Sequence, residues 1–333
     1  MQNNIEIEDG QAPLEQTGSD TYVSKALADI KTEVAKVIVG QDEVVTLSFA
    51  ALLIGGHVLL EGVPGVAKTL MAKSIAKAMD LQFSRVQFTP DLMPSDVTGT
   101  SIFNLKTSEF EFKKGPVFTQ ILLIDEINRS PAKTQASLFE VMEEKQVTND
   151  NHTYKLKLPF FVMATQNPVE QEGTYQLPEA QLDRFVFKII VKLPSLEEEV
   201  QILQKYQSDF KSQQIDTLNS VIHPDLLIKC QDEIEKVIIS EQIINYIAKI
   251  VSATRMHDDI FLGGSPRASL NIMKASKCIA AIKGRNFVIP DDVKYVSGFV
   301  LYHRIILQPE REMTGVKVEE VVQEIFASIE VPR

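Results

Sequence analysis

One short stretch near the start of the chain constrains the fold more than any other. The apolar run Val58-Leu59-Leu60 leads into Gly62-Val63-Pro64-Gly65-Val66-Ala67-Lys68-Thr69, and a helical pattern begins directly afterwards at Leu70. A strand that passes through such a loop into a helix directs several backbone N–H groups at one point near the positive helix end. The segment follows the pattern G-x-x-x-x-G-K-[ST], so it predicts a phosphate-binding loop.

Two side chains of this loop would contact a nucleotide directly. Lys68 would reach the outer phosphates, and the Thr69 hydroxyl would hold Mg²⁺. Ala67 departs from the pattern, which has glycine at that position. Alanine is harmless there if its φ is negative and strained if its φ is positive. The helical pattern that begins at once favours the negative value. A turn without a ligand is the simpler interpretation, and the Lys-Thr ending disfavours it.

Length and charge limit the classes of protein that the chain could belong to. Its 333 residues, 44% of them hydrophobic, provide material for about two domains. A net charge of -11 and a pI near 5.1 argue against a general affinity for polyanions, although a local basic patch could exist. Nucleic acid is therefore not the first ligand expected.

Cysteines, histidines and apolar tracts indicate a soluble protein of a reducing cytoplasm. Cys230 and Cys278 are far apart and form no C-x-x-C, so neither a disulfide framework nor a thiolate metal site is indicated. The longest apolar tract, Phe49 to Leu60, is interrupted and too short for a membrane span, and no signal sequence opens the chain. The histidines show no H-E-x-x-H spacing, so no zinc site is predicted.

Strand-like runs alternate with helical patterns over the first two thirds of the chain. Helical patterns run from Tyr22 to a stop at Gly40 and from Asp42 through Ile54. After the phosphate loop, four more apolar runs follow: Phe83 to Phe88, Ile121 to Ile124, Phe160 to Ala164 and Phe185 to Val191. Five apolar strands separated by helices predict an α/β fold with a doubly wound parallel sheet, whose ligands bind at the C-terminal strand ends.

Two segments interrupt this alternation, and a third part follows it. Residues 100–113 and 145–158 each read as a polar-tipped β-hairpin. Beyond Pro194 no strand-like run appears, and helices are predicted to begin at Ser195, at Ser240, at Ser265 and near Pro290. We therefore expect a disordered acidic tail at 1–20, an α/β nucleotide-binding domain at 21–194 and an all-helical lid at 195–333. The nucleotide would lie between the domain and the lid.

Polar residues follow two of the predicted strands at the ligand-binding edge. Asp125 and Glu126 end a run that is apolar on both faces. Asp125 would hold Mg²⁺, while Glu126 would polarise a water for in-line attack on the γ-phosphate. Asn167, at the end of an adjacent strand, could position that water or sense the γ-phosphate. Its alternative role is to cap the turn before Pro168.

Two arginines are candidates for further phosphate contacts. Arg184 precedes the last strand, and an arginine supplied to a neighbour's γ-phosphate accelerates hydrolysis by ~10³ to 10⁵. The alternative is a salt bridge to Asp183 or Glu179. Arg267 follows Pro266 in the first turn of a predicted helix, where the macrodipole disfavours a cation by roughly 0.3 to 1 kcal/mol. A nearby phosphate would reverse that penalty, and the alternative is a solvated surface arginine.

Five motifs in this order resemble the MoxR family of AAA+ ATPases, and the match covers nearly everything after the tail. They are Gly62-Val63-Pro64-Gly65-Val66-Ala67-Lys68-Thr69, Ile124-Asp125-Glu126-Ile127-Asn128-Arg129, Ala164-Thr165-Gln166-Asn167-Pro168, Leu177-Pro178-Glu179-Ala180-Gln181-Leu182-Asp183-Arg184-Phe185 and Gly264-Ser265-Pro266-Arg267. In that family alanine is usual at the position of Ala67. The hairpins at 100–113 and 145–158 look like its helix-2 insert and pre-sensor-1 hairpin.

The resemblance implies a role for each site residue. It makes Asn167 sensor 1, Arg184 the arginine finger and Arg267 sensor 2, with Arg129 a second candidate for an arginine that acts across a subunit boundary. The nucleotide would be bound by Val39 and Gly40 near the adenine and by Gly62, Val63, Pro64, Gly65, Val66, Ala67, Lys68, Thr69 and Leu70.

The function that the resemblance implies is Mg²⁺-dependent ATP hydrolysis by a homo-hexameric ring. Such a ring would remodel or activate a protein client, often with partners that bear a von Willebrand factor A domain. A nucleic-acid motor is the alternative, because ring helicases carry the same inserts and Lys106, Lys155 and Lys157 could touch a backbone. A nucleotide-gated scaffold is a third hypothesis, which the presence of Glu126 disfavours.

Overall fold

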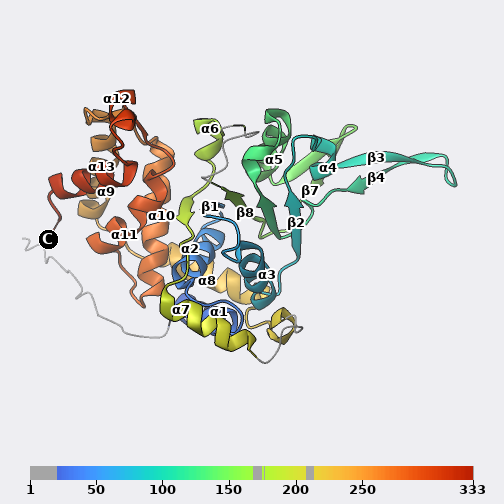
Figure 1. Ribbon diagram of the computed structural model, residues 1–333, viewed down its shortest axis with the longest axis horizontal. Coiled ribbons are helices and arrows are strands. Elements are labelled where there is room, and N and C mark those ends of the chain that lie inside the picture. Colours follow the sequence, from blue (N-terminus) through green and yellow to red (C-terminus); the bar gives the residue numbers. More distant parts are fainter. Residues whose placement is uncertain (1–20, 168–174, 176, 208–213, 333) are drawn as a thin grey trace, which may run out of the picture.

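A five-stranded parallel sheet forms the centre of the molecule (Figure 1). The computed structural model describes residues 21–167, 175, 177–207 and 214–332, so the predicted tail at 1–20 lies outside the described residues. The strand order is β2-β5-β8-β1-β9. The strands are β1 (Val58–Glu61), β2 (Phe83–Gln87), β5 (Ile121–Asp125), β8 (Phe161–Gln166) and β9 (Phe187–Ile190). The predicted α/β fold with five parallel strands is confirmed.

Parallel pairing gives the sheet two chemically different edges. Leu60 is in register with Thr165 of β8 and Ile189 of β9, and Gln87 of β2 is in register with Asp125 of β5. All C-terminal strand ends therefore lie together, and we call this side the C-terminal edge. The starts of the strands form the N-terminal edge, one strand length away.

Helices cover both faces of the sheet. One face packs on α1 (Tyr22–Ala35), α2 (Asp42–Leu53) and α3 (Lys68–Ala78), and the other packs on α5 (Ala132–Glu144), with α4 (Pro94–Thr98) beside α5. Helix α1 ends at Ala35, so the predicted stop at Gly40 was wrong. The chain turns earlier because Val37 and Ile38 are buried beside the phosphate loop.

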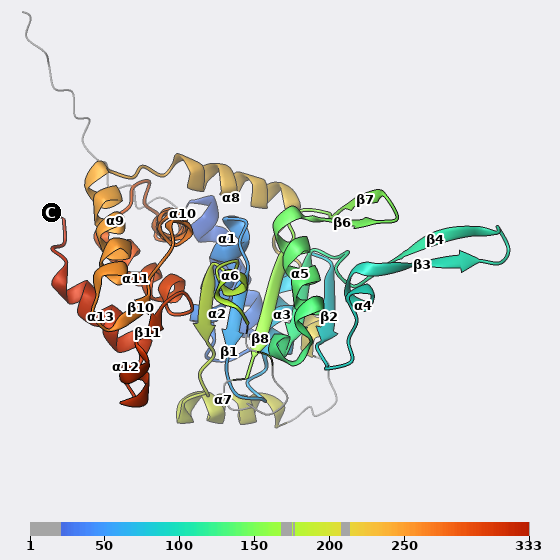
Figure 2. The same ribbon diagram turned by 90° about the horizontal axis from the view of Figure 1, so that it is seen from above.

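Both predicted hairpins are present, and one extends far from the body of the molecule (Figures 1 and 2). The first consists of β3 (Gly99–Asn104) and β4 (Glu109–Lys114), and the second of β6 (Gln146–Asn149) and β7 (His152–Lys155). The hairpins contact each other, because Phe112 stacks on Tyr154 with ring centroids 4.4 Å apart.

The second half of the chain is mainly helical, and its predicted helix starts are confirmed. Ser195, Ser240 and Ser265 are the N-caps of α7, α9 and α10, and α11 begins at Pro290. Its helices are α6 (Glu179–Leu182), α7 (Leu196–Tyr206), α8 (Pro224–Lys236), α9 (Glu241–Met256), α10 (Pro266–Ile282), α11 (Pro290–Leu301), α12 (Pro309–Met313) and α13 (Val318–Ser328), with a short 3-10 turn at Gln214–Thr217. Another short 3-10 turn, Ile127–Arg129, lies between β5 and α5 in the first half.

The expectation of an all-helical lid was wrong in one respect. Strands β10 (Ile260–Leu262) and β11 (Ile306–Leu307) form an antiparallel ribbon, and they are too short for a visible period-two pattern. Side chains of the lid share one hydrophobic core with α1, α2 and one face of the sheet. The boundary at residue 194 stays a prediction. No described helix combines the length and apolar character that crossing a membrane requires.

Candidate active site at the two edges of the sheet

The phosphate loop joins β1 to α3 at the C-terminal edge. Gly65 has φ +90°, and a Cβ on Gly62 would lie 2.8 Å from the Val191 carbonyl oxygen, so both glycines are required by the local geometry. Ala67 has φ +56° and ψ +25°, which is left-handed, and the predicted negative φ was therefore wrong. Helix α3 begins at Lys68, the residue that follows Ala67. Ala67 is the N-cap, and cap residues lie outside the helical conformation.

The side chains predicted to bind the outer phosphates and magnesium and to activate water border one cavity of about 460 Å³ at this edge, whereas the two predicted arginines do not. Its lining residues include Lys68, Thr69, Asp125, Glu126 and Asn167. The Lys68 ammonium donates to the Gly62 carbonyl oxygen at 2.6 Å. Partial burial lowers the pKa of Lys68, while the carboxylates of Asp125, Glu126 and Glu61 act in the opposite direction.

Asp125 supplies a buried carboxylate at the floor of this cavity. It is 8% exposed, its Oδ2 accepts from Arg85 Nε at 2.6 Å, and its Oδ1 accepts from the Thr165 hydroxyl at 3.4 Å. Thr69 lines the same cavity. Hydroxyl and carboxylate oxygens are hard ligands of the kind that Mg²⁺ prefers, so the donor set fits this ion.

Glu126 is held by several neighbours in a left-handed conformation, with φ +57° and ψ +54°. Its Oε2 accepts from Gln87 Nε2 at 2.9 Å and pairs with Arg129 Nε at 3.0 Å. Its backbone N–H donates to Thr165 Oγ1 at 3.0 Å. Arg129, the second candidate for a trans-acting arginine, therefore lies beside Glu126 of its own subunit.

Sequence reasoning missed Arg85, Gln87 and Thr165 as residues of this site. Arg85 and Gln87 alternate along β2, which places both on one face. That alternation was visible in the sequence. The pairing of β2 with β5 was not, and this pairing brings Arg85 to Asp125 and Gln87 to Glu126.

An apolar pocket of about 110 Å³ adjoins the phosphate cavity. It is lined by Val39 and Leu70 together with Ile202 and Tyr206 of α7. A Cβ on Gly40, whose φ is +75°, would collide with the Glu198 carboxylate. Helix α7, which belongs to the expected lid, therefore lines part of this pocket.

A second cleft of about 300 Å³ lies at the opposite, N-terminal edge of the sheet. It is lined by His57 before β1, by Val186 before β9 and by the C-terminal end of α5. Both predicted arginines, Arg184 and Arg267, line this cleft. The structure therefore brings the two arginines together, but a strand length away from Lys68 of the same subunit.

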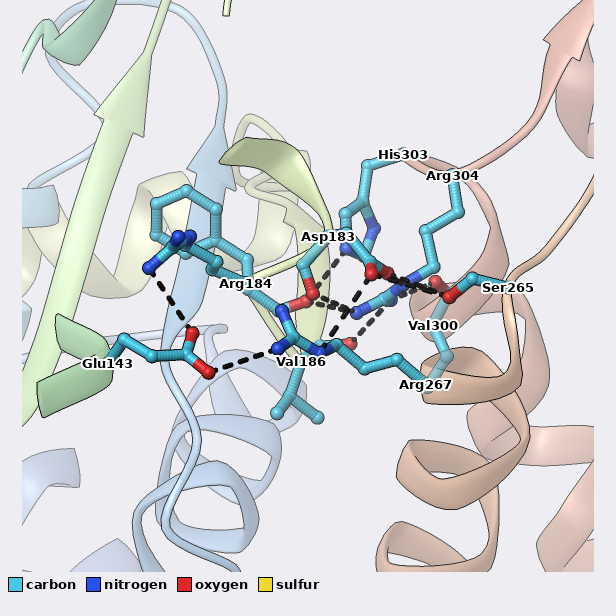
Figure 3. A network of polar contacts seen from close by, with 10 residues as sticks. Glu143, Asp183, Arg184, Val186, Ser265, Arg267, Val300, His303 and Arg304 are labelled. Carbon is cyan, nitrogen blue, oxygen red and sulfur yellow. Dashed lines mark hydrogen bonds and ion pairs between the residues drawn. The ribbon is translucent and has the colours of Figure 1, made fainter. Parts of the chain in front are cut away.

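The two arginines share one carboxylate (Figure 3). Arg184 Nη1 donates to the Phe139 carbonyl oxygen at 2.6 Å and lies 3.2 Å from Glu143 Oε2. Arg267 Nη2 lies 3.1 Å from Glu143 Oε1, and its Nε lies 3.9 Å from Asp183 Oδ2. Arg267 is in the first turn of α10, as predicted, and the anions beside it are carboxylates.

A buried arginine fixes the lid to this edge. Arg304 is 6% exposed, and its Nε donates to Asp183 Oδ1 at 2.6 Å. Its other nitrogens donate to four backbone carbonyl oxygens, those of Asp183, Phe185, Val186 and Val300. Burial lowers the pKa of Arg304, and Asp183 opposes that shift. Arg304 thus joins the end of α11 to the segment that carries Arg184.

One cluster elsewhere in the lid has side chains that ligate metals. Ligand atoms of His257, Asp259 and Glu324 lie within 4.8 Å of one another. Asp259 already pairs with Arg311 at 2.6 Å, and His257 Nδ1 accepts from the Asp259 backbone N–H at 3.2 Å. These contacts favour a structural role for the cluster.

A phosphate loop, an acidic pair on a central strand and a helical lid define a P-loop ATPase of the AAA class. A model of the ATPase family associated with various cellular activities (AAA) matches residues 57–187, and a model of the AAA lid domain matches residues 252–325. The chain is 42% identical to chaperone MoxR1 of Mycobacterium tuberculosis, over 90% of this chain and 81% of that one. It belongs to the MoxR family of AAA+ ATPases.

Two further relatives extend the comparison to nearly the full length. The chain is 51% identical to the uncharacterized protein YeaC of Bacillus subtilis, over 89% of this chain and 92% of that one. A crystal structure of an inferred ATPase from Cytophaga hutchinsonii superposes with a TM-score of 0.86 at 42% identity, and covers 94% of this chain and 96% of that one.

Proposed function

We propose that this protein hydrolyses ATP in a head-to-tail homo-hexameric ring and uses the cycle to remodel or activate a protein client. One observation carries the ring: the phosphate cavity and the arginine cleft lie at opposite edges of the sheet. In a heterologous ring, each subunit presents one face to the different face of its neighbour. The Arg184 and Arg267 cleft of one subunit then completes the phosphate cavity of the next.

Within one site, each side chain has a separate task. Lys68 binds the outer phosphates, and Thr69 and Asp125 hold Mg²⁺, which when bound neutralises charge on the phosphates. Glu126 polarises a water that attacks the γ-phosphorus in line, the bond to the β–γ bridging oxygen breaks, and ADP and phosphate leave. Asn167 orients that water. Arg184 of the neighbouring subunit stabilises the charge on the transferred group.

The positions of the two candidate arginines support Arg184 over Arg129 as the trans-acting residue. Arg129 pairs with Glu126 at 3.0 Å in its own subunit, whereas Arg184 lies at the opposite edge. Arg267 shares the cleft with Arg184, which supports its action on the same neighbouring nucleotide. In this arrangement Arg267 would sense the γ-phosphate in trans.

The projecting hairpin supports a protein client over a nucleic acid. Phe103 and Phe110 form an edge-to-face pair with centroids 5.2 Å apart and remain 45% and 73% exposed, and Leu105 at the tip is 85% exposed. Exposed apolar clusters of this kind mark protein contacts. Glu109 and Glu111 lie on the same hairpin among Lys106, Lys113 and Lys114, and this mixture of charges suits a protein surface better than a phosphate backbone.

Two measurements test the proposal. The rate of ATP hydrolysis per subunit should rise with protein concentration, because rings form. Mass photometry at each concentration measures the fraction of subunits in rings. Proteins captured by the Glu126→Gln variant with ATP should then be purified and added to the unmodified protein, where a true client raises turnover. Salt-sensitive stimulation by DNA or RNA, lost in Lys155→Ala/Lys157→Ala, would refute the client proposal in favour of a nucleic-acid motor.

A further inference from the structure

Glu143 lies at a helix position that is unfavourable for a carboxylate. It is the penultimate residue of α5, which ends at Glu144, and Lys145 follows as a left-handed C-cap. The C-terminal end of a helix carries partial negative charge, so an acidic side chain there is repelled by the helix itself. Helix stability therefore does not explain this glutamate, and its contacts must be considered.

Those contacts are with two cations that come from different parts of the chain. One carboxylate oxygen of Glu143 lies 3.2 Å from Arg184, and the other lies 3.1 Å from Arg267 (Figure 3). Arg184 precedes β9 of the sheet, whereas Arg267 lies on α10 of the lid. One side chain thus joins both arginines across the cleft.

The second acid of the cleft is already engaged. Asp183 accepts from the buried Arg304 at 2.6 Å and from the Ser265 hydroxyl at 3.3 Å, and its nearest approach to Arg267 is 3.9 Å. Two guanidinium groups that converge without a shared anion repel each other. Glu143 supplies that shared anion in the free subunit.

We infer that Glu143 is a positioning residue for the trans-acting arginines, an inference that rests on the proposed ring. It keeps the two guanidinium groups converged on one point, so that a neighbour's γ-phosphate meets both together. Glu143 is 48% exposed, and exposed ion pairs are weak. A multiply charged phosphate can therefore replace the carboxylate at little cost in free energy. The two guanidinium groups are then already oriented toward the phosphate before the transition state forms.

The test is Glu143→Gln, which keeps the shape of the side chain and removes its charge. Turnover at saturating ATP should fall about tenfold, since misplaced catalytic groups cost up to ~10²-fold. The ATP affinity of dilute, unassembled subunits, the ring population and the thermal unfolding midpoint should remain unchanged. Glu143→Asp, which restores the charge, should recover most of the turnover. Glu140→Gln, the same charge change on an exposed residue of α5, should behave like the unmodified protein.

Subunit mixing tests whether Glu143 acts through the arginines. Rings mixed from Glu143→Gln and Glu126→Gln subunits should regain activity at one kind of interface. There the Glu143→Gln subunit supplies an intact Glu126, and the Glu126→Gln subunit supplies arginines that its own Glu143 positions. Turnover at or above the unmodified level in Glu143→Gln, or no recovery on mixing, would overturn the inference. Unchanged turnover in Arg184→Ala and Arg267→Ala would instead refute the trans roles of these arginines, which the ring proposal includes.

Discussion

The two edges of the sheet differ in how their functional residues are brought together. At the C-terminal edge, a contiguous loop and the ends of three neighbouring strands supply the phosphate cavity. At the N-terminal edge, the residues come from three segments that are far apart in sequence. Glu143 lies on α5, Arg184 lies before β9, and Arg267 lies on α10. The first edge is a local consequence of strand, loop and helix. The second depends on how the lid packs against the sheet.

In the proposed ring, this difference means that the catalytic parts are divided between subunits. The C-terminal edge carries the residues proposed to bind ATP and activate water, whereas the N-terminal edge carries the two arginines proposed to act on the neighbouring subunit's nucleotide. Variants at the two edges should therefore fail in different ways.

A large loss of turnover with ATP binding intact is expected at the arginine edge. Arg184→Ala should lower turnover by ~10³-fold or more and leave ATP affinity largely intact, because the arginine stabilises charge that develops in the transition state. Mixing Arg184→Ala with Glu126→Gln subunits should restore part of the activity, measured as steady-state phosphate release. Mixtures that co-assemble without any recovery would count against a trans role and favour Arg129.

At the phosphate edge, two variants should separate binding from chemistry. Lys68→Ala removes the charge on the outer phosphates and should abolish nucleotide binding. Glu126→Gln should bind ATP normally and lose ~10²- to 10⁴-fold in turnover, because the group that polarises the water is lost. Isothermal titration and single-turnover assays distinguish the two defects. Near-normal turnover in Glu126→Gln would remove this residue from the mechanism.

Acid should weaken the N-terminal edge through a buried histidine. Burial lowers the pKa of His57 to about 4, and His57 Nδ1 accepts from the Val162 backbone N–H at 3.0 Å. The unfolded chain binds the proton below its ordinary pKa of ~6.5, whereas the folded chain resists it until about pH 4, so stability is lost as the pH falls through this window.

The expected loss can be measured by denaturant titration. From pH 7.5 to pH 5, His57 should account for about 2 kcal/mol of the decrease in the free energy of unfolding. His57→Gln should show a correspondingly shallower pH dependence. An identical slope in both proteins would show that His57 does not resist protonation in the folded state.

Arg267 should distinguish the single subunit from the ring. In dilute, unassembled protein, Arg267→Ala should leave the ratio of ATP to ADP affinity unchanged, because the cleft is remote from that subunit's own nucleotide. In assembled rings ATP should bind about tenfold more weakly, while ADP is little affected, since a charged hydrogen bond contributes ~1.5 to 3 kcal/mol. A weakened ATP affinity in dilute subunits would place Arg267 on its own nucleotide.

The sequence permitted prediction of the sheet, the hairpins and the C-terminal edge for a physical reason. Apolar runs of strand length, the loop around Lys68 and the Asp125-Glu126 pair are local patterns whose chemistry depends on near neighbours. The contact of Arg184 and Arg267 through Glu143 depends on tertiary packing, which no local period encodes. The early end of α1 and the β10–β11 ribbon were missed for the same reason.

The smallest expected effect concerns Ala67, where local reasoning about the phosphate loop failed. Its φ of +56° requires a left-handed conformation that costs an alanine ~1 kcal/mol relative to glycine. The greater flexibility of glycine in the unfolded chain offsets ~0.4 to 1 kcal/mol of that cost. Ala67→Gly should therefore change the free energy of unfolding by less than about 1 kcal/mol.

The ATP affinity of Ala67→Gly should stay near that of the unmodified protein, because the backbone N–H groups keep their direction. Lys68→Ala, which leaves this backbone unchanged, is the matched control for nucleotide binding. A large loss of ATP affinity in Ala67→Gly would show that the alanine methyl group itself contacts the nucleotide.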